Sequence, residues 1–166
     1  MSTENLYDRK ALDKIREMVN NIDFCMLATK LTSKPLSVVP MSTKKIDEQG
    51  AIWFLSGADS DHNHNIELDP DIQLLYSKPG DLSFLSVYGQ ATITRDQGIL
   101  EELYDKSDDN WFEGVEDPNL TAIKFVPREA YYWDAKYNKI VTLFKLAVGA
   151  ITNSETDTSV EGRMKV

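Results

Sequence analysis

The stretch with the most structural information covers residues 36–68 and reads LSVVPMSTKKIDEQGAIWFLSGADSDHNHNIEL. Residues 36–46 and 51–55 are two runs of strand-forming residues. Between them, Asp47-Glu48-Gln49-Gly50 is typical of a hairpin connection, because glycine readily takes the positive φ of a tight turn. A turn containing Gly57 follows the second run, and residues 60–68 predict a short helix that ends at Asp69-Pro70-Asp71.

The rest of the chain continues this alternation of short strands and turns. Apolar residues at helical spacing predict a first helix capped by Asp8. Further strands are predicted over residues 24–31, 72–76, 82–94 and 122–133, the last interrupted by Pro127. Helices are predicted over residues 97–104 and 140–151, and residues 105–119 look like an acidic loop. This order predicts a mainly β fold with flanking helices, in which an antiparallel barrel is closed or partly closed.

Length and composition predict one domain over residues 1–152, followed by a polar, disordered tail over residues 153–166. The single cysteine, Cys25, lies in an apolar run, which favours a buried, inert thiol and a reducing cytoplasm. A net charge of −9 argues against a nucleic-acid partner. The sequence has no apolar run of the roughly 20 residues that a membrane helix needs, and no apolar signal segment near its start.

The turn between the second strand and the short helix is the first candidate site. The first N–H groups of a helix have no partner within the helix and lie at its positive end, so they suit an anion. Ser56 and Ser60 add hydroxyl donors, and His62 adds a further donor or a positive charge. Spacing alone favours the simpler interpretation, in which Ser60 is only an N-cap.

This turn resembles the FMN-phosphate loop of pyridoxamine-phosphate-oxidase-like split barrels. Ser56, Ser60 and His62 fall on the family's phosphate-binding positions, and His62 stands where lysine is usual. The resemblance implies a split β-barrel of the FMN-binding type, with FMN as the cofactor. It also implies a homodimer with two equivalent sites across the subunit interface.

A second matching segment precedes the hairpin. Pro40-Met41-Ser42 is similar to the strand that lies against the flavin ring in the general-stress-protein branch of the family, with Val39 in place of the usual arginine. The resemblance places the ring near Met41, Ser42 and Phe54, with Leu55 beside them. The alternation of this segment equally fits an ordinary half-buried strand.

Two aromatic segments extend the resemblance over most of the chain. Residues 131–134, Tyr-Tyr-Trp-Asp, resemble the family's final strand, whose tryptophan packs near the flavin of the partner subunit. Trp133 takes that place here. Residues 111–114 resemble the Trp-Phe loop of the general-stress-protein branch, so Trp111 is a further candidate contact that the partner subunit supplies. Either aromatic would fit a core or an interface as well.

Other functions fit the sequence less well. His62 and His64 are two residues apart and lie on different faces of a helix, so they do not form a zinc motif. Neither lies in a nucleophile elbow, and no Gly-rich nucleotide fingerprint is present. Acidic residues between Glu101 and Asp109 read as a solvated face. True pyridoxamine-phosphate oxidase activity is disfavoured, because the Arg-rich C-terminal segment of such enzymes is missing.

Two functions therefore remain. One is a flavin-dependent oxidoreductase linked to the stress response, in which FMN supplies the redox chemistry and the protein supplies orientation. The other is a non-catalytic, dimeric module that binds or senses a flavin. Besides these two flavin-binding functions, the sequence also fits a scaffold that has lost the cofactor.

Overall fold

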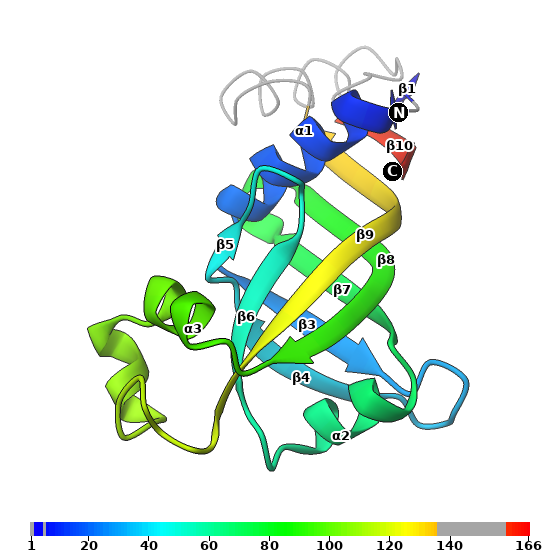
Figure 1. The fold of residues 1–166 in the computed structure, drawn as a ribbon. Helices are drawn as coiled ribbons and strands as arrows, with labels where there is room; N and C mark the ends of the chain where they lie inside the picture. The colour runs from blue at the N-terminus through cyan, green and yellow to red at the C-terminus, as the bar shows by residue number, and fades with distance from the viewer. Residues whose placement is uncertain (1, 5, 136–158) are drawn as a thin grey trace.

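The computed structural model describes residues 2–4, 6–135 and 159–166, and shows a mainly β split barrel with flanking helices (Figure 1). The strands are β1 (Ser2–Thr3), β2 (Leu6–Tyr7), β3 (Phe24–Thr29), β4 (Ser37–Ser42), β5 (Lys45–Ile46), β6 (Ile52–Gly57), β7 (Asp71–Lys78), β8 (Ser83–Thr94), β9 (Leu120–Ala135) and β10 (Ser159–Lys165). The helices are α1 (Asp8–Asn20), α2 (Asp61–Leu68) and α3 (Gln97–Leu103), with 3-10 turns η1 (Pro79–Asp81) and η2 (Lys106–Asn110). The predicted fold class is confirmed.

The long strand β9 organises the sheet. The main strand order is β1-β10-β9-β8-β7-β3-β4, and β6 also pairs with β9. Strand β8 follows β9 along almost its whole length, whereas the other edge of β9 pairs first with β6 and then with β10. Because β6 and β10 pair with successive parts of the same edge of β9, the sheet curls and splits between them (Figure 1).

Strand β9 runs through Pro127, where the sequence predicted an interruption. Gly89 of β8 pairs with Pro127, and Tyr88 pairs with Glu129, so Arg128 is an extra residue in the ladder. A β-bulge tolerates proline because the ladder is already broken there. Gly89 is required at this point, since a Cβ would lie 2.2 Å from the carbonyl oxygen of Val126. Strand β9 is therefore continuous, and the interruption predicted at Pro127 corresponds to this bulge.

The hairpin between β5 and β6 forms as predicted. The Asp47 N–H donates to the Ala51 carbonyl at 2.9 Å, and the Gly50 N–H donates to the Asp47 carbonyl at 3.0 Å. Gly50 has a φ of +88°, a backbone angle that residues with a side chain rarely adopt. Trp53 donates its indole N–H to Asp47 Oδ2 at 2.8 Å, which anchors the turn to β6.

Alternation along β6 separates two apolar cores. Phe54 is fully buried inside the barrel, together with Leu74 and Phe125. Trp53 points to the other face and packs with residues of α3, among them Leu100. Helices α1 and α2 cover opposite ends of the barrel (Figure 1). The second core holds α3 beside β6, and this arrangement positions the site described below.

The C-terminal end differs from the prediction. Ser159–Lys165 form β10, which pairs antiparallel with β9 and parallel with β1 and β2. The predicted disorder is therefore wrong for these residues. Their isolated sequence is polar and short, and the partners that hold the strand are distant in sequence. The predicted helix over residues 140–151 lies outside the described residues.

Candidate functional site

A cavity of about 400 Å³ opens between the edge of the sheet, the start of α2 and the segment around η2. Its volume lies within the usual range for small-molecule sites, roughly 300–1,000 Å³. Twelve residues line it: Phe24, Pro40, Met41, Ser42, Lys44, Leu55, Ser56, Gly57, His62, Asp108, Trp111 and Phe112. The cavity thus joins segments that are far apart in the sequence.

The turn from β6 to α2 forms one end of this cavity. Ser60 caps α2, because its Oγ accepts a hydrogen bond from the Asn63 N–H at 3.3 Å. The turn itself is held by Asn119, whose carbonyl accepts from the Ala58 N–H at 2.7 Å and whose Oδ1 accepts from the Asp59 N–H at 3.1 Å. The start of α2 is therefore fixed beside the cavity, which His62 of its first turn lines.

A buried polar network ties α2 to two strands. Ser56 Oγ donates to Asn63 Oδ1 at 2.8 Å, and the Asn63 amide donates to Thr121 Oγ1 at 2.9 Å. The two hydroxyls of Ser56 and Thr121 also lie 2.8 Å apart. All three residues are almost fully buried. The hydroxyl hydrogen of Ser56 is therefore already used within the protein, although Ser56 lines the cavity.

His62 presents a polar atom that has no partner among the described residues. Its Nε2 is buried and makes no hydrogen bond, and the residue lines the cavity. Burial lowers the pKa of His62 below its ordinary value, and the nearby Asp61 carboxylate opposes this only in part. The neutral imidazole is thus favoured. A buried nitrogen without a partner is costly, so a ligand atom at this place would be stabilising.

Strand β4 forms the opposite wall. It pairs only with β3 within the part of the chain that the structure describes, so it is an edge strand there. Pro40, Met41 and Ser42 all line the cavity. An edge strand leaves backbone N–H and C=O groups unpaired on its outer side, and these groups can form hydrogen bonds with the polar edge of a planar ligand.

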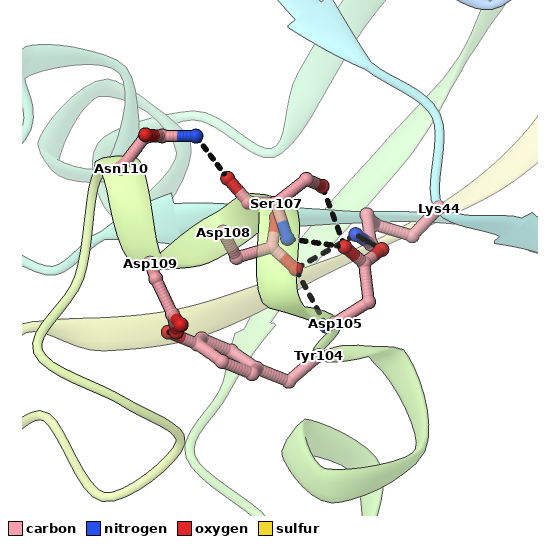
Figure 2. Close-up of polar contacts among 7 residues, drawn as sticks. All are labelled: Lys44, Tyr104, Asp105, Ser107, Asp108, Asp109 and Asn110. Carbon is pink, nitrogen blue, oxygen red and sulfur yellow. Dashed lines mark hydrogen bonds and ion pairs between the residues drawn. The ribbon is translucent and has the colours of Figure 1, made fainter.

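The segment around η2 closes the third side through an ion-pair cluster (Figure 2). Lys44 Nζ lies 2.6 Å from Asp105 Oδ2 and 2.8 Å from Asp108 Oδ2. Asp108 Oδ2 also accepts from the Asp105 N–H at 2.8 Å, and Asp105 Oδ1 accepts from the Ser107 N–H at 2.7 Å. The Asp108 backbone N–H in turn donates to the Asp105 side chain, and these two reciprocal bonds between Asp105 and Asp108 form a capping box that orders η2.

The electrostatics of this cluster favour the charged forms of Lys44 and Asp105. Burial lowers the pKa of Lys44, but hydrogen bonds to Asp105 and Asp108 outweigh it, so the pKa is raised overall. The pKa of Asp105 is held well below its ordinary value, mainly by the bond from Lys44 and then by the bonds from Ser107. The prediction of a solvated acidic face is wrong for Asp108, whose side chain is 13% exposed, whereas the Asp105 side chain is 59% exposed. Glu102 likewise pairs with Lys45.

The structure brings most of the predicted site residues to one cavity. Those that line it are Pro40, Met41, Ser42, Leu55, Ser56, His62 and Trp111. Ser60 lies beside it as the cap of α2. Phe54 instead belongs to the barrel core and Trp133 lies on another part of the sheet, so neither lines the cavity. The sequence analysis missed Lys44 and Asp108 as cavity residues. The spacing Asp105-x-x-Asp108, which is typical of a capping box, was the one available sign that this segment is ordered.

The described residues contain no group of three or more His, Cys, Asp or Glu side chains that could hold a metal ion. Among the same residues, no helix is both long and apolar enough to cross a membrane.

The sequence was also compared with known proteins. A family model described as "Pyridoxamine 5'-phosphate oxidase like" matches residues 10–157. The chain belongs to this family. The pyridoxamine 5'-phosphate oxidase like assignment agrees with the resemblance read from the sequence. No curated protein matches the chain.

Solved structures share the fold of this family member. A protein described as general stress protein 26 from Jannaschia sp. CCS1 is 22% identical, with a TM-score of 0.80 over 93% of this chain and 97% of that one. General stress protein 26 from Bacillus anthracis is 23% identical, with a TM-score of 0.64 over 73% and 92%. The general stress FMN/FAD binding protein from Xanthomonas citri is 21% identical, with a TM-score of 0.65 over 76% and 90%. At these identities the likeness shows the fold.

Proposed function

We propose that this protein binds FMN in the cavity between β4, α2 and η2 and acts as a flavin-dependent oxidoreductase linked to the stress response. The observation that carries the proposal is the unpartnered, buried Nε2 of His62 at the cavity wall beside the start of α2. Family membership supports it, as does the name of the Xanthomonas citri protein, a general stress FMN/FAD binding protein. The buried, reduced thiol of Cys25 supports a cytoplasmic location.

The phosphate end of the ligand is assigned to the start of α2. The first-turn amides of α2, the Ser60 hydroxyl and His62 Nε2 can all donate hydrogen bonds to phosphate oxygens. Ser56 holds Asn63 in place and so acts indirectly, through the position of the helix. An anion here would also favour the protonated form of His62.

The ring end of the ligand is assigned to the β4 wall. Met41 and Ser42 offer backbone groups from an edge strand, while Phe24 and Phe112 offer apolar surface. Bound FMN would supply one- and two-electron redox chemistry at its ring. The protein residues, Trp111 among them, would orient the ring and limit its contact with water.

A homodimer is supported by an exposed apolar surface next to the cavity. Phe24 is 63% exposed, Met26 42% and Leu75 44%, and Met26 lies between Leu75 and Pro40 in the sheet register. Apolar side chains that lie together at a surface mark an interaction site. Since Phe24 and Pro40 also line the cavity, a second copy on this surface would complete the cavity wall.

Trp133 belongs to the same outer surface. It is 37% exposed and stacks on Tyr131, with ring centroids 6.5 Å apart. Tyr131 pairs with Ser86, which pairs with Leu75, so these side chains continue the exposed row of the sheet. In an isologous dimer, Trp133 would be free to reach the partner's cavity.

A second candidate function, a non-catalytic flavin binder, is favoured by the titratable groups at the cavity. Lys44 and Asp108 neutralise each other, and burial keeps His62 towards its neutral form. The lining therefore presents no carboxylate or lysine that is free to transfer protons during turnover.

An absorption titration with FMN tests the proposal. Purified protein should take up FMN with a shifted flavin spectrum, and replacing Ser60 and His62 together by Ala should weaken binding by more than about tenfold, the value of one or two charge-assisted bonds. His64→Ala is the matched control, because His64 is exposed on the same helix and does not line the cavity. Protein that takes up no FMN would refute the proposal.

Two further measurements test the enzymatic activity and the homodimer separately. Bleaching of bound flavin by NADH or NADPH, followed by reoxidation with an added acceptor, supports the enzyme, and stable colour without turnover supports the binder. Light scattering should give the mass of two chains, and Met26→Asp with Leu75→Asp should give that of one. A wild-type monomer would refute the dimer alone.

A further inference from the structure

Among the described residues that line the cavity, Lys44 is the only lysine or arginine. It lies in the link between β4 and β5, whereas the start of α2 forms a different wall. The Lys44 side chain is 12% exposed, so much of its charge faces protein groups rather than water. On residue type alone, this lysine would be a binding site for a second anionic group beside the flavin.

The structure gives Lys44 two anionic partners already. Asp105 and Asp108 contact Nζ at 2.6 Å and 2.8 Å, and Asp108, which is 13% exposed, itself lines the cavity. The cluster of one lysine and two carboxylates therefore carries a net charge of about −1. Bonds to η2 backbone groups hold both carboxylates, so an incoming anion would have to displace an acid that is fixed in place (Figure 2).

We infer that Asp105 and Asp108 determine substrate charge: by occupying Lys44, they make this side of the cavity select an uncharged or cationic second substrate and reject one that bears a phosphate. The inference rests on the proposed function, in which the flavin phosphate takes the α2 end. It names the class of molecule that exchanges electrons with the flavin, and it makes Asp105 and Asp108 specificity-determining residues.

The geometry also separates this cluster from its acidic neighbours. Asp109 faces away and accepts a hydrogen bond from the Tyr104 hydroxyl at 2.8 Å (Figure 2). Asp109 therefore adds a negative charge to the same segment without contacting Lys44. Comparing its substitution with those of Asp105 and Asp108 distinguishes occupation of Lys44 from the general negative charge of the segment.

Calorimetric titration with a matched pair of probes tests the inference. Pyridoxine and pyridoxine 5'-phosphate differ by one phosphate, and each is titrated at low salt into protein saturated with FMN, or into flavin-free protein if FMN does not bind. Wild type should bind the neutral probe at least as tightly as the phosphate probe. In Asp105→Asn with Asp108→Asn, the ratio of the two dissociation constants should shift toward the phosphate probe by at least about tenfold.

Asparagine can still accept the capping hydrogen bonds of η2, so this double variant keeps the segment folded. Asp109→Asn should leave the ratio within about twofold, and adding Lys44→Gln to the double variant should abolish the shift. Lys44→Gln alone should shift the ratio of the dissociation constants toward the neutral probe, because the two carboxylates then remain without their cation and repel the phosphate.

Two results would overturn the inference: a wild-type preference for the phosphate probe of about tenfold or more, or an unchanged ratio in the double variant. Failure of the proposed function is recognised separately, since it shows as the absence of FMN uptake in the wild type before either probe is added.

Discussion

Asn63→Ala tests whether the buried network holds α2 at the cavity. Asn63 is 2% exposed and its side chain makes two hydrogen bonds, one from the Ser56 hydroxyl and one to Thr121 Oγ1. Each buried bond of this kind contributes about 1 kcal/mol net, and a hydroxyl left without its acceptor adds a further cost. Truncation should therefore lower the free energy of unfolding by about 2–3 kcal/mol.

Urea denaturation at neutral pH, followed by far-ultraviolet circular dichroism, measures this loss. Asn110→Ala is the control: Asn110 is exposed and makes one bond, to the Ser107 carbonyl at 2.8 Å, so its loss should stay within about 0.5 kcal/mol.

A double-mutant cycle with Thr121→Val adds a second criterion. Both side chains belong to one network, so the double variant should lose about 1 kcal/mol less than the sum of the single losses. A loss below about 0.5 kcal/mol for Asn63→Ala, or strict additivity in the cycle, would refute the reasoning.

Three other predictions follow from the geometry. Gly89→Ala should lower the unfolding free energy by more than about 2 kcal/mol in the same urea assay, because its Cβ would lie 2.2 Å from the Val126 carbonyl oxygen; an unchanged midpoint would contradict this. The pKa of Asp105 is depressed in the folded state, so the charged carboxylate stabilises the fold. The difference in unfolding free energy between wild type and Asp105→Asn should therefore be constant above pH 3.8, the ordinary pKa of this group, and shrink as the pH falls further. Urea unfolding across this pH range measures the difference. NMR titration should find the pKa of His62 below 6.5 in flavin-free protein and higher with FMN bound; no rise would place the phosphate elsewhere.

Local pattern was enough to predict most of the elements. Apolar spacing predicted the helix that became α1, and the turn residues Asp47 and Gly50 predicted the hairpin between β5 and β6. The cap at Ser60 and the start of α2 were also read from neighbouring residues. These features depend on φ, ψ preferences and on side-chain periodicity within a few residues, which is why one sequence suffices for them.

The site could be predicted in part. The family resemblance led to β4, the end of β6 and α2, and the structure brings these segments to one cavity. It could not distinguish Phe54, which points into the core, from Leu55, which lines the cavity, because a shift of one residue reverses the face of a strand. It assigned Trp133 and Trp111 to the flavin of the partner subunit; in the structure Trp133 lies on the outer surface, whereas Trp111 lines the cavity of its own chain.

Long-range contacts were decided by the tertiary structure alone. Lys44 and Asp105 are 61 positions apart, and Ser56 and Thr121 are 65 apart, so no local pattern reveals either pair. Strand β10 has a polar sequence without a strong strand signal and forms because β9 offers it an edge. Such contacts depend on the register of β6, β8 and β9 against one another, and register is a property of the folded barrel that residue preferences along the chain do not specify.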